Sequence, residues 1–395
     1  MNSLLKLLLA SLLALAATAS VPIRQELFRS GADGYAHYRI PGLIVTAKGS
    51  LLAYAEARKT LRGDWGTIDI VLRRSTDGGR TWSPMKVIAQ VDGPKTKNPV
   101  AMAQNLASSE DVTYNNPVAI ADRQSGVVHF LFCLEYMRAF YLRSDDDGQS
   151  FSPAREITST FDQFKKDYDW KVLATGPGHG IQLRNGRLLV PVWLSLGTGG
   201  HAHRPSVTAT IYSDDGGKTW HRSEIAVPNT TEFINPNETA AAQLTDGTVL
   251  LNVRTESKPN RRVLVTSRDG ATGWAKPVFE DSLVEPICFG SMLSLSKKRL
   301  LYIGPDSLSR QSGKAEPGTS RDRRNLTIHF SNNDGKSWQG KRVVEPGWSG
   351  YSDISASGKT IHVLFEMGVK DASSFRVESL VFESFPFSPQ AFLKN

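Results

Sequence analysis

Cysteine is almost absent from this chain of 395 residues, which has only Cys133 and Cys288. So few cysteines exclude a small fold held together by disulfide bonds. No cysteine lies in the spacing that a structural zinc site requires. Both cysteines stand in apolar surroundings, so we expect two buried free thiols, and we expect neither a metal nor a cofactor.

The chain also lacks an apolar run of about 20 residues, the length that a membrane-spanning helix needs. The apolar stretch at residues 7–16 is shorter, interrupted only by Ser11, and it follows Lys6. It precedes Ala17-Thr18-Ala19, the small-residue pattern that a signal peptidase recognises. We interpret residues 1–19 as a cleaved signal peptide and residues 20–395 as a single domain. The mature protein is then secreted or periplasmic, monomeric and without a membrane span.

Acidic residues are outnumbered by basic ones, giving a formal charge of +8 and a pI near 9.4. This balance favours an anionic partner. The basic residues are scattered along the chain instead of clustering on one element, unlike the usual pattern of a nucleic-acid-binding surface. An acidic sugar is the other candidate, and charge alone does not choose between them.

Long helical periodicity is missing as well, and one short helix is expected at residues 160–166. A turn pattern recurs instead: Ser-x-Asp-x-Gly-x-Thr/Ser-aromatic. Its copies occupy residues 75–82, 144–151, 213–220 and 331–338, with Asn333 at the Asp place in the last, and a degenerate copy at 267–274. In such a turn the Asp accepts hydrogen bonds from backbone N–H groups, and the Gly takes a positive φ.

The spacing of the repeats predicts the fold. The mean distance between their first residues is 64, and alternating apolar stretches such as residues 68–74 and 206–212 lead into them. A repeat of this length built from short strands is typical of a propeller blade. We therefore predict an all-β protein, a six-bladed β-propeller of four-stranded antiparallel blades with the repeats as hairpins.

These repeats resemble the Asp boxes of the exo-α-sialidase (neuraminidase) family of bacteria and animals. By themselves Asp boxes say little about function, because they fasten turns and also occur in propellers without activity. The resemblance extends over residues 21–390 and includes the stretches 115–117, 176–180 and 283–286. It implies an anionic sugar as the partner and argues against nucleic acid.

The chemistry of sialic acid indicates which residues to look for. Its anomeric carbon carries an ionised carboxylate, which planar, always charged arginines bind in a bidentate manner. A carboxylate nucleophile would be repelled there, whereas a tyrosine deprotonated by a glutamate would not, and sialidases depart from the two-carboxylate scheme in this way. An aspartic acid must also protonate the leaving oxygen.

The first candidates lie near the N-terminus. Tyr38-Arg39-Ile40-Pro41 is similar to the Arg-Ile-Pro motif of the family, which makes Arg39 the first carboxylate-binding arginine. Asp64 lies nine residues before Arg73, as does the acid/base Asp of sialidases; Asp69 is the rival, read as a strand residue. Glu56 and Arg58 resemble the supporting ion pair of the family, with a structural role or substrate contact both open.

The resemblance implies that Glu238 activates the tyrosine and that Arg254, 16 residues later, is the second arginine. A turn at residues 245–248 between two strands would bring both to the same end of the propeller. Glu232 and Glu256 are competitors that do not match the family context.

The third arginine is expected to be Arg323, eight residues before Ser331, as in the family pattern. Arg324 would point to the opposite face of the strand, and Arg321 would lie in the preceding loop.

The nucleophile is implied to be Tyr351, in the stretch Gly347-Trp348-Ser349-Gly350-Tyr351. Glu366 resembles the glutamate that holds the first arginine in place. Asn116 is expected to contact the substrate. Trp193 is expected either to form a wall of the pocket beneath the N-acetyl or glycerol arm of the sugar or to belong to the core.

The resemblance implies an exo-α-sialidase that hydrolyses terminal α-linked sialic acids from glycoproteins, glycolipids or oligosaccharides, with retention and through a tyrosine nucleophile. A trans-sialidase would use the same residues. A non-catalytic sialoglycan-binding propeller is the third possibility, and it would be expected to lack Tyr351, Glu238 or Asp64.

Overall fold

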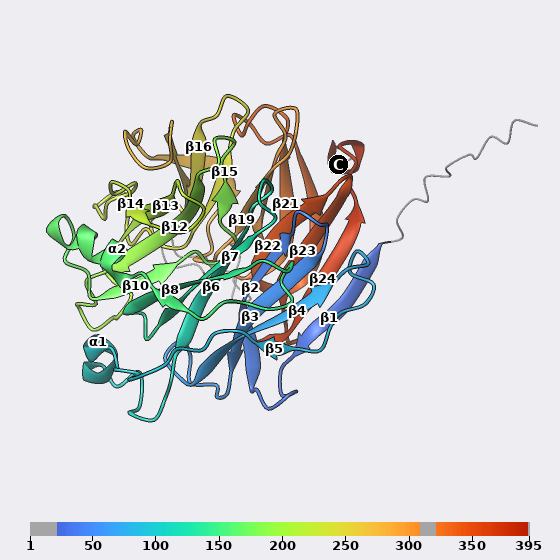
Figure 1. Cartoon of the computed structure of the whole chain (residues 1–395). Helices are drawn as coiled ribbons and strands as arrows, with labels where there is room; N and C mark the ends of the chain where they lie inside the picture. Colours follow the sequence, from blue (N-terminus) through green and yellow to red (C-terminus); the bar gives the residue numbers. More distant parts are fainter. Residues whose placement is uncertain (1–21, 309–320, 394–395) are drawn as a thin grey trace, which may run out of the picture.

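The computed structural model describes residues 22–308 and 321–393, and the expected signal peptide at residues 1–19 lies outside them. The regular secondary structure of the described chain consists almost entirely of antiparallel strands, as predicted (Figure 1). No described helix is long and apolar enough to cross a membrane. Cys133 and Cys288 are both buried free thiols, as expected.

Four of the five sheets follow one another along the chain. The first contains β2 (His37–Val45), β3 (Leu51–Arg58), β4 (Ile68–Ser75) and β5 (Lys86–Val87). The second contains β6 (Tyr114–Ala121), β7 (Val128–Leu134), β8 (Arg138–Ser144) and β9 (Arg155–Glu156). The third contains β10 (Val172–Thr175), β11 (Ile181–Gln182), β12 (Leu188–Ser195), β13 (Ser206–Ser213) and β14 (His221–Arg222). The fourth contains β15 (Thr239–Gln243), β16 (Val249–Val253), β17 (Arg261–Ser267) and β18 (Val278–Val284).

The fifth sheet has seven strands, so the expected set of separate four-stranded sheets is not what the structure contains. Its strands, in spatial order, are β1 (Ile23–Arg29), β24 (Val377–Pro386), β23 (Thr360–Gly368), β22 (Gly340–Ser357), β21 (Arg324–Ser331), β20 (Leu300–Pro305) and β19 (Ser291–Ser294). The long strand β22 joins its two parts, because residues 340–348 pair with β21 and residues 349–357 pair with β23. The sheet also brings both ends of the chain together, since β1 pairs with β24.

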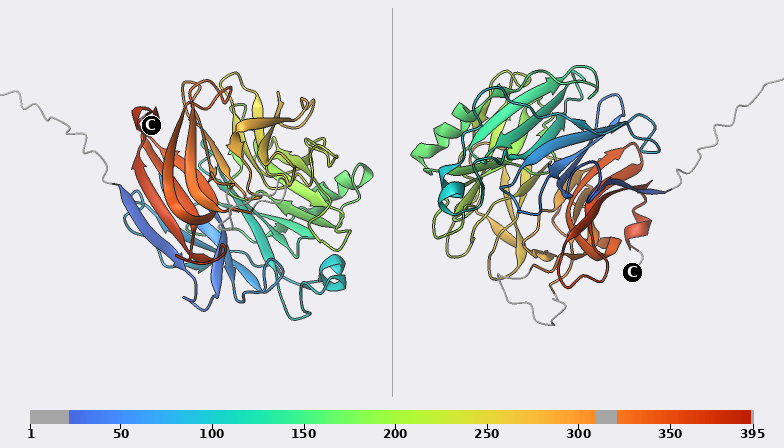
Figure 2. Two further views of the ribbon diagram at one scale, coloured as in Figure 1. Left: turned by 180° about the vertical axis from the view of Figure 1, so that it is seen from behind. Right: turned by 90° about the horizontal axis from the view of Figure 1, so that it is seen from below.

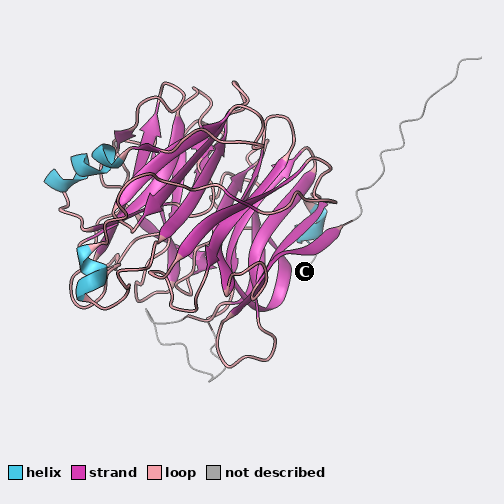
Figure 3. Cartoon of the chain, turned by 60° about the horizontal axis from the view of Figure 1, so that its bottom comes forward, coloured by secondary structure: helices cyan, strands magenta, loops and turns pink. Residues whose placement is uncertain are grey.

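The inner strands of the sheets form a closed ring. β2 packs against β6 and β22, β6 against β10 and β11, β11 against β15, β15 against β19, and β19 against β22. Two views of the ribbon show the first sheet, in blue, beside the last, in orange to red (Figure 2). The few helices lie at the periphery (Figure 3). They are α1 (Pro99–Ala103), α2 (Thr158–Asp162), the 3-10 helix η1 (Gln163–Lys166), which with α2 covers the predicted short helix, and α3 (Gln390–Leu393).

All five repeats form the same hydrogen-bonded turn. In the first, the Ser75 hydroxyl donates to Asp77 and accepts from the Gly79 N–H at 2.9 Å, and Asp77 accepts from the N–H and hydroxyl of Thr81. Equivalent bonds recur around Asp146 and Asp215, and around Asp269 in a turn that is one residue shorter. They also recur around Asn333, except that its Nδ2 donates to the Ser337 hydroxyl. The repeats are therefore turns that stabilise hairpins, and the polar side chains of their Ser, Asp and Thr positions are engaged in hydrogen bonds within the turn.

Each repeat also packs on a neighbouring strand through a glycine. A Cβ atom on Gly148 would lie 2.6 Å from Leu52 in the preceding sheet, and one on Gly270 would lie 2.6 Å from Leu189. At Gly79 it would overlap the ring of Phe382 in β24. These glycines let each hairpin approach its neighbour closely enough to close the ring.

Two adjacent glycines of the first repeat allow a test. Gly78 and Gly79 have similar positive φ values, 75° and 89°, but only Gly79 faces a packed side chain. Both alanine variants carry the backbone strain, whereas Gly79→Ala must also displace Phe382, at an additional cost of about 1–3 kcal/mol. We expect a clearly lower Tm for Gly79→Ala than for Gly78→Ala in thermal unfolding. Equal Tm values would contradict this packing.

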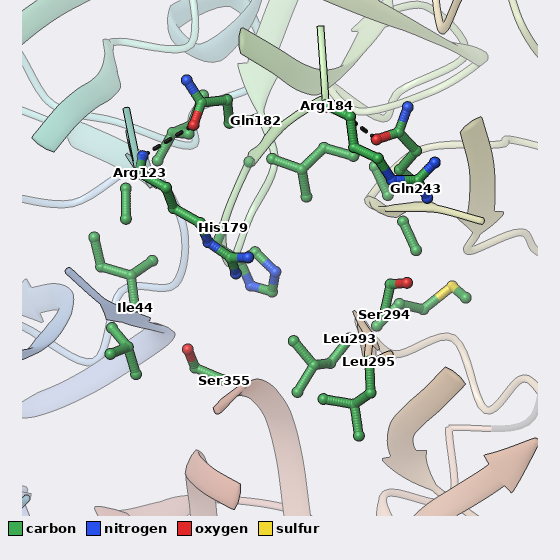
Figure 4. Close-up of a pocket in the computed structure, with 18 of the residues that line it drawn as sticks. Ile44, Arg123, His179, Gln182, Arg184, Gln243, Leu293, Ser294, Leu295 and Ser355 are labelled. Carbon is green, nitrogen blue, oxygen red and sulfur yellow. Dashed lines mark hydrogen bonds between the residues drawn. The ribbon is translucent and has the colours of Figure 1, made fainter. Parts of the chain in front are cut away.

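The ring has a cavity at each end. Figure 4 shows the larger one, about 610 Å³, lined by Ile44, His179, Gln243 and Ser355 among others. None of the site residues expected from the sequence lines it. β2 and β22 line both cavities. Ile44 and Ser355 of these strands line the larger one, and Arg39 and Tyr351, which come earlier in the same strands, line the smaller one, about 230 Å³.

Candidate active site

The smaller cavity collects most of the residues expected from the sequence. Its lining includes Arg39, Asp64, Asn116, Trp193, Glu238, Arg254, Arg323 and Tyr351. They come from segments far apart in the sequence, several of them on or next to the inner strands. Arg58, Glu56 and Glu366 lie directly behind this lining and contact it.

Tyr351 lines the cavity and is only 5% exposed. Its hydroxyl donates to the Glu238 carboxylate, whose two oxygens lie 2.7 and 2.6 Å away. Arg254 donates to the same hydroxyl at 2.6 Å and also pairs with Glu238. Burial raises the pKa of Tyr351 well above its usual value, with Arg254 opposing and Glu238 adding to the shift. The phenol is thus neutral, with a proton acceptor in direct contact.

The hairpin expected between Glu238 and Arg254 is present. β15 and β16 pair antiparallel, and beyond their last ladder pair Arg254 N donates to Glu238 O at 3.0 Å. Both residues therefore lie at the same end of the hairpin.

Two further arginines flank the tyrosine ring. The guanidinium carbons of Arg39 and Arg323 lie 5.3 and 5.2 Å from the ring centre of Tyr351. Arg323 donates to the Ile287 carbonyl at 2.8 Å, and no carboxylate of the described chain pairs with it. Arg254 therefore contacts the tyrosine hydroxyl, and Arg39 and Arg323 lie next to the tyrosine ring.

Glu366, on β23, is completely buried and holds this arrangement together. Its carboxylate accepts from Arg39 Nε at 2.6 Å, from the Ile40 N–H at 3.1 Å and from the Tyr351 N–H at 3.0 Å. Ile40 has a φ of 58°, which is unfavourable for a β-branched residue and lies in a bulge of β2. Glu366 thus fixes both Arg39 and the backbone of Tyr351.

Asp64 lies in the loop between β3 and β4, and 45% of its side chain is exposed. It pairs with Arg58 Nη1 at 2.9 Å, while Arg58 also binds the buried Glu56 at 2.6 Å. Desolvation alone would raise the pKa of the Asp64 carboxyl, but the charges of Arg58, and further off Arg39, hold it well below its usual value. Glu56 in turn accepts from the N–H of Asn116 at 2.8 Å.

The rival residues lie elsewhere or have other partners. Asp69, in β4, accepts from the Tyr35 hydroxyl at 2.7 Å and does not line the cavity. Arg324 pairs with Asp322 at 2.6 Å, away from the tyrosine. Glu232 is exposed on a loop. Glu256 and Arg321 do line the cavity, although they were not the residues favoured by the sequence.

Three aromatic rings also line the cavity, those of Tyr136, Trp193 and His203. The Trp193 ring is 5.2 Å from that of His203 and 6.2 Å from that of Tyr136. Trp193 Nε1 and His203 Nε2 are buried with no hydrogen-bond partner in the described chain. Burial lowers the pKa of His203 to about 4, although Asp64 opposes the shift. Trp193 therefore belongs both to a packed cluster and to the cavity wall.

Sequence reasoning missed several lining residues: Tyr136, His201, His203, Arg204 and Asn237. They lie in turns and loops between strands, with no repeat or periodic pattern around them. The one signal was the run His201-Ala202-His203-Arg204, which is unusually rich in polar rings and charge. Nowhere in the described chain do three or more acidic, His or Cys side chains form a metal-binding group.

Comparison with known protein families agrees with the fold and the repeats. The sequence profile described as a BNR repeat-like domain matches residues 49–363, which is most of the chain. The fold and this match together define a BNR-repeat protein.

Individual relatives narrow the class. The sialidase of Bacteroides fragilis (strain YCH46) is 31% identical over 359 residues, and that of Micromonospora viridifaciens is 28% identical over 371. These matches cover 86% and 87% of this chain but 62% and 52% of those proteins, so the chain spans little more than half of their length. Sialidase-2 of Rattus norvegicus is 29% identical, with 89% of its length covered. The chain belongs to the BNR-repeat sialidase family.

Solved structures agree in architecture. The Hadza microbial sialidase Hz136 superposes with a TM-score of 0.73 at 26% identity, covering 94% of this chain and 69% of that one. The intramolecular trans-sialidase from Ruminococcus gnavus has the same fold, with a TM-score of 0.70 at 17% identity, covering 93% and 98% of the two chains.

The low pKa of Asp64 makes a pH-dependent contribution to stability. Because the folded pKa lies below the unfolded value of about 4, the ionised carboxylate stabilises the fold above that pH and loses this effect as the pH falls. Asp64→Asn removes the charge at every pH. We therefore expect the Tm difference between parent and variant to be largest near neutral pH and to shrink below about pH 4.

All other carboxylates are common to the two proteins, so their protonation cancels in the difference. A Tm difference that stays constant or grows between pH 6 and pH 3 would mean that Arg58 does not stabilise the Asp64 carboxylate.

Proposed function

We propose that this chain is an exo-α-sialidase that hydrolyses terminal α-linked sialic acids from glycoproteins, glycolipids or oligosaccharides, with retention of configuration. The observation that carries the proposal is the Tyr351 hydroxyl, held between Glu238 and Arg254 within 2.7 Å and flanked by Arg39 and Arg323. A buried tyrosine with its own base and a surplus of positive charge matches a nucleophile for an anionic sugar.

The substrate carboxylate would bind between Arg39, Arg254 and Arg323. Arg39 is held through its Nε atom by Glu366, and its terminal nitrogens make no hydrogen bond within the described chain. Of these three arginines, Arg323 is the one without a carboxylate partner in the described chain, so the substrate carboxylate would be its partner. Planar guanidinium groups bind carboxylates through paired hydrogen bonds, which sets the orientation of the sugar as well as its affinity.

In the first step the Tyr351 oxygen attacks the anomeric carbon, and Glu238 takes the phenolic proton. The bond to the leaving oxygen breaks as Asp64 donates a proton to it, so the leaving sugar departs as a neutral alcohol. Since Arg58 holds Asp64 ionised in the free protein, Asp64 must acquire its proton before or during substrate binding. The product of this step is a covalent sugar–tyrosine intermediate.

In the second step water attacks the anomeric carbon and Asp64, now a carboxylate, takes the proton of that water. The bond to Tyr351 breaks, and Glu238 returns its proton to the phenolic oxygen. Two displacements at one carbon give overall retention.

Other contacts would position the sugar. We assign Asn116 and Trp193, which line the cavity, to substrate binding, with Trp193 beneath the N-acetyl or glycerol arm. The buried Arg58 would contribute to substrate binding from behind the lining, through Asp64. Glu56 and Glu366 support the arginines from behind. No cofactor is needed for these steps.

We further propose that the seven-stranded sheet comprises two blades that share β22, which makes a six-bladed propeller. Its division between residues 348 and 349 supports this count. Residues 1–19 would be a signal peptide, and residues 20–395 one monomeric, secreted or periplasmic domain. Transfer to an acceptor sugar instead of water, or glycan binding without chemistry, would be recognised from the products of a sialoside.

The nucleophile is tested by Tyr351→Phe, which keeps the ring but removes the reacting oxygen. We expect kcat on an aryl sialoside to fall by several orders of magnitude with unchanged circular dichroism. Tyr168→Phe is the control, because its hydroxyl also donates one hydrogen bond, to Pro205, but outside the cavity. For the parent protein, proton NMR of the reaction should show the α-anomer of the released sialic acid as the first product. Activity of Tyr351→Phe within tenfold of the parent would refute the assignment.

The acid is tested by varying the leaving group. Asp64→Ala should slow a natural sialyl-galactose linkage far more than an aryl sialoside, because a phenolate leaves without needing a proton. Asp69→Ala is the matched control and should not discriminate between the two substrates. Equal losses on both substrates for Asp64→Ala would show that Asp64 only positions the sugar.

A further inference from the structure

The cavity has more arginines than one substrate carboxylate requires. Besides Arg39, Arg254 and Arg323 it is lined by Arg204 and Arg321, which lie at its rim. Their side chains are 32% and 48% exposed, whereas Arg254 is 11% exposed. The two rim arginines are thus placed to meet a part of the substrate that extends out of the cavity.

The carboxylate of Glu256 lies near both rim arginines but is hydrogen-bonded only to Arg204 of the two. Glu256 Oε1 accepts from Arg204 at 2.7 and 3.1 Å, and its Oε2 accepts from Asn235 at 3.1 Å. The nearest approach of Arg321 to Glu256 is 3.9 Å, beyond a hydrogen bond. Glu256 therefore fixes Arg204 in place and leaves the donors of Arg321 available.

The rim also has an excess of positive charge. Besides partial desolvation, the like charges of Arg254, Arg323 and, more weakly, Arg204 lower the pKa of Arg321, and Glu256 only partly compensates. An incoming anion would offset the electrostatic repulsion between Arg321 and the neighbouring guanidinium groups. The substrate carboxylate bound by the inner three arginines would not reach a rim position as well.

The rim arginines share one part of the cavity with Asp64. The ring of Trp65, next to Asp64, lies 5.6 Å from the ring of His203, next to Arg204. Arg321 approaches the same Glu256 carboxylate that binds Arg204, and all of these groups except Trp65 line the cavity. Asp64 is the proposed proton donor to the leaving oxygen, and the sugar attached to that oxygen must therefore extend past it. That sugar would leave the cavity beside Arg204 and Arg321.

We propose that Arg204 and Arg321 form a subsite for an oxyanion on the penultimate sugar. The favoured substrates are sialosides whose second residue is itself acidic, through a carboxylate, as in sialic acid linked to sialic acid, or through a sulfate ester. This inference rests on the proposed sialidase function and adds a substrate class to it. Glu256 is a positioning residue that holds Arg204 at the rim.

The test compares kcat/KM for three substrates: sialyllactose, the same compound carrying a sulfate on galactose, and disialyllactose with one sialic acid linked to the other. We expect the parent to favour at least one acidic substrate over sialyllactose. Arg321→Gln and Arg204→Gln should each lower kcat/KM for that substrate about five- to tenfold, as for loss of one net hydrogen bond at an exposed site, and change sialyllactose less than about twofold. The two acidic substrates distinguish a carboxylate subsite from a sulfate subsite.

Two controls separate charge from structural support. Arg321→Lys keeps the charge and should retain most of the preference, and Arg80→Gln, on the exposed first repeat, should leave all three values unchanged. The preference should also weaken as ionic strength rises, because the rim is exposed. An equal loss on all three substrates, or no loss on any, would overturn the subsite. Absence of hydrolysis of every substrate, including an aryl sialoside, would instead refute the sialidase function on which the subsite rests.

Discussion

The site depends on one buried carboxylate, that of Glu366. It is the only group in the described chain that contacts both Arg39, near the start of the first sheet, and the backbone of Tyr351, in the last. Its third contact, the Ile40 N–H, stabilises a strained backbone beside Arg39. β23 lies in the sheet in which β1 pairs with β24, so the sheet that closes the ring also positions Glu366 at the cavity.

Charge explains why the site needs so many supporting residues. Arg58 is buried, and the side chains of Arg39 and Arg254 are only 17% and 11% exposed. Removing the partner of a buried charge costs on the order of 3–5 kcal/mol. Each of these arginines has an acidic partner. Glu366 pairs with Arg39, and Glu238 pairs with Arg254. Glu56 and Asp64 both pair with Arg58. Arg323 has only a carbonyl oxygen, which leaves the cavity with unsatisfied positive charge near Tyr351. The fold thus tolerates a cation that only an anionic ligand would neutralise.

How much could be predicted from the sequence depends on how far apart in the sequence the interacting residues lie. The repeats are local, so the hydrogen bonds around Asp77 and the hairpin between Glu238 and Arg254 were predicted correctly. The joined sheet was not, because nothing in residues 340–357 marks that one strand pairs on both of its edges in succession. The cavity residues Tyr136 and His203 were missed because they meet only when separate loops come together. Their neighbours in sequence have no pattern that would indicate a binding site, whereas the arginines and Tyr351 stood in motifs.

The central claim is that Tyr351 forms a covalent bond with the sugar, and trapping that intermediate tests it most directly. A sialic acid with fluorine at carbons 2 and 3 can lose the first as fluoride, while the second slows the release of the sugar from the protein. Peptide mapping by mass spectrometry after incubation should find the sugar on the peptide that contains Tyr351, attached to the tyrosine oxygen. An adduct on Glu238, Asp64 or another residue, or no adduct in a preparation that hydrolyses sialosides, would contradict the account.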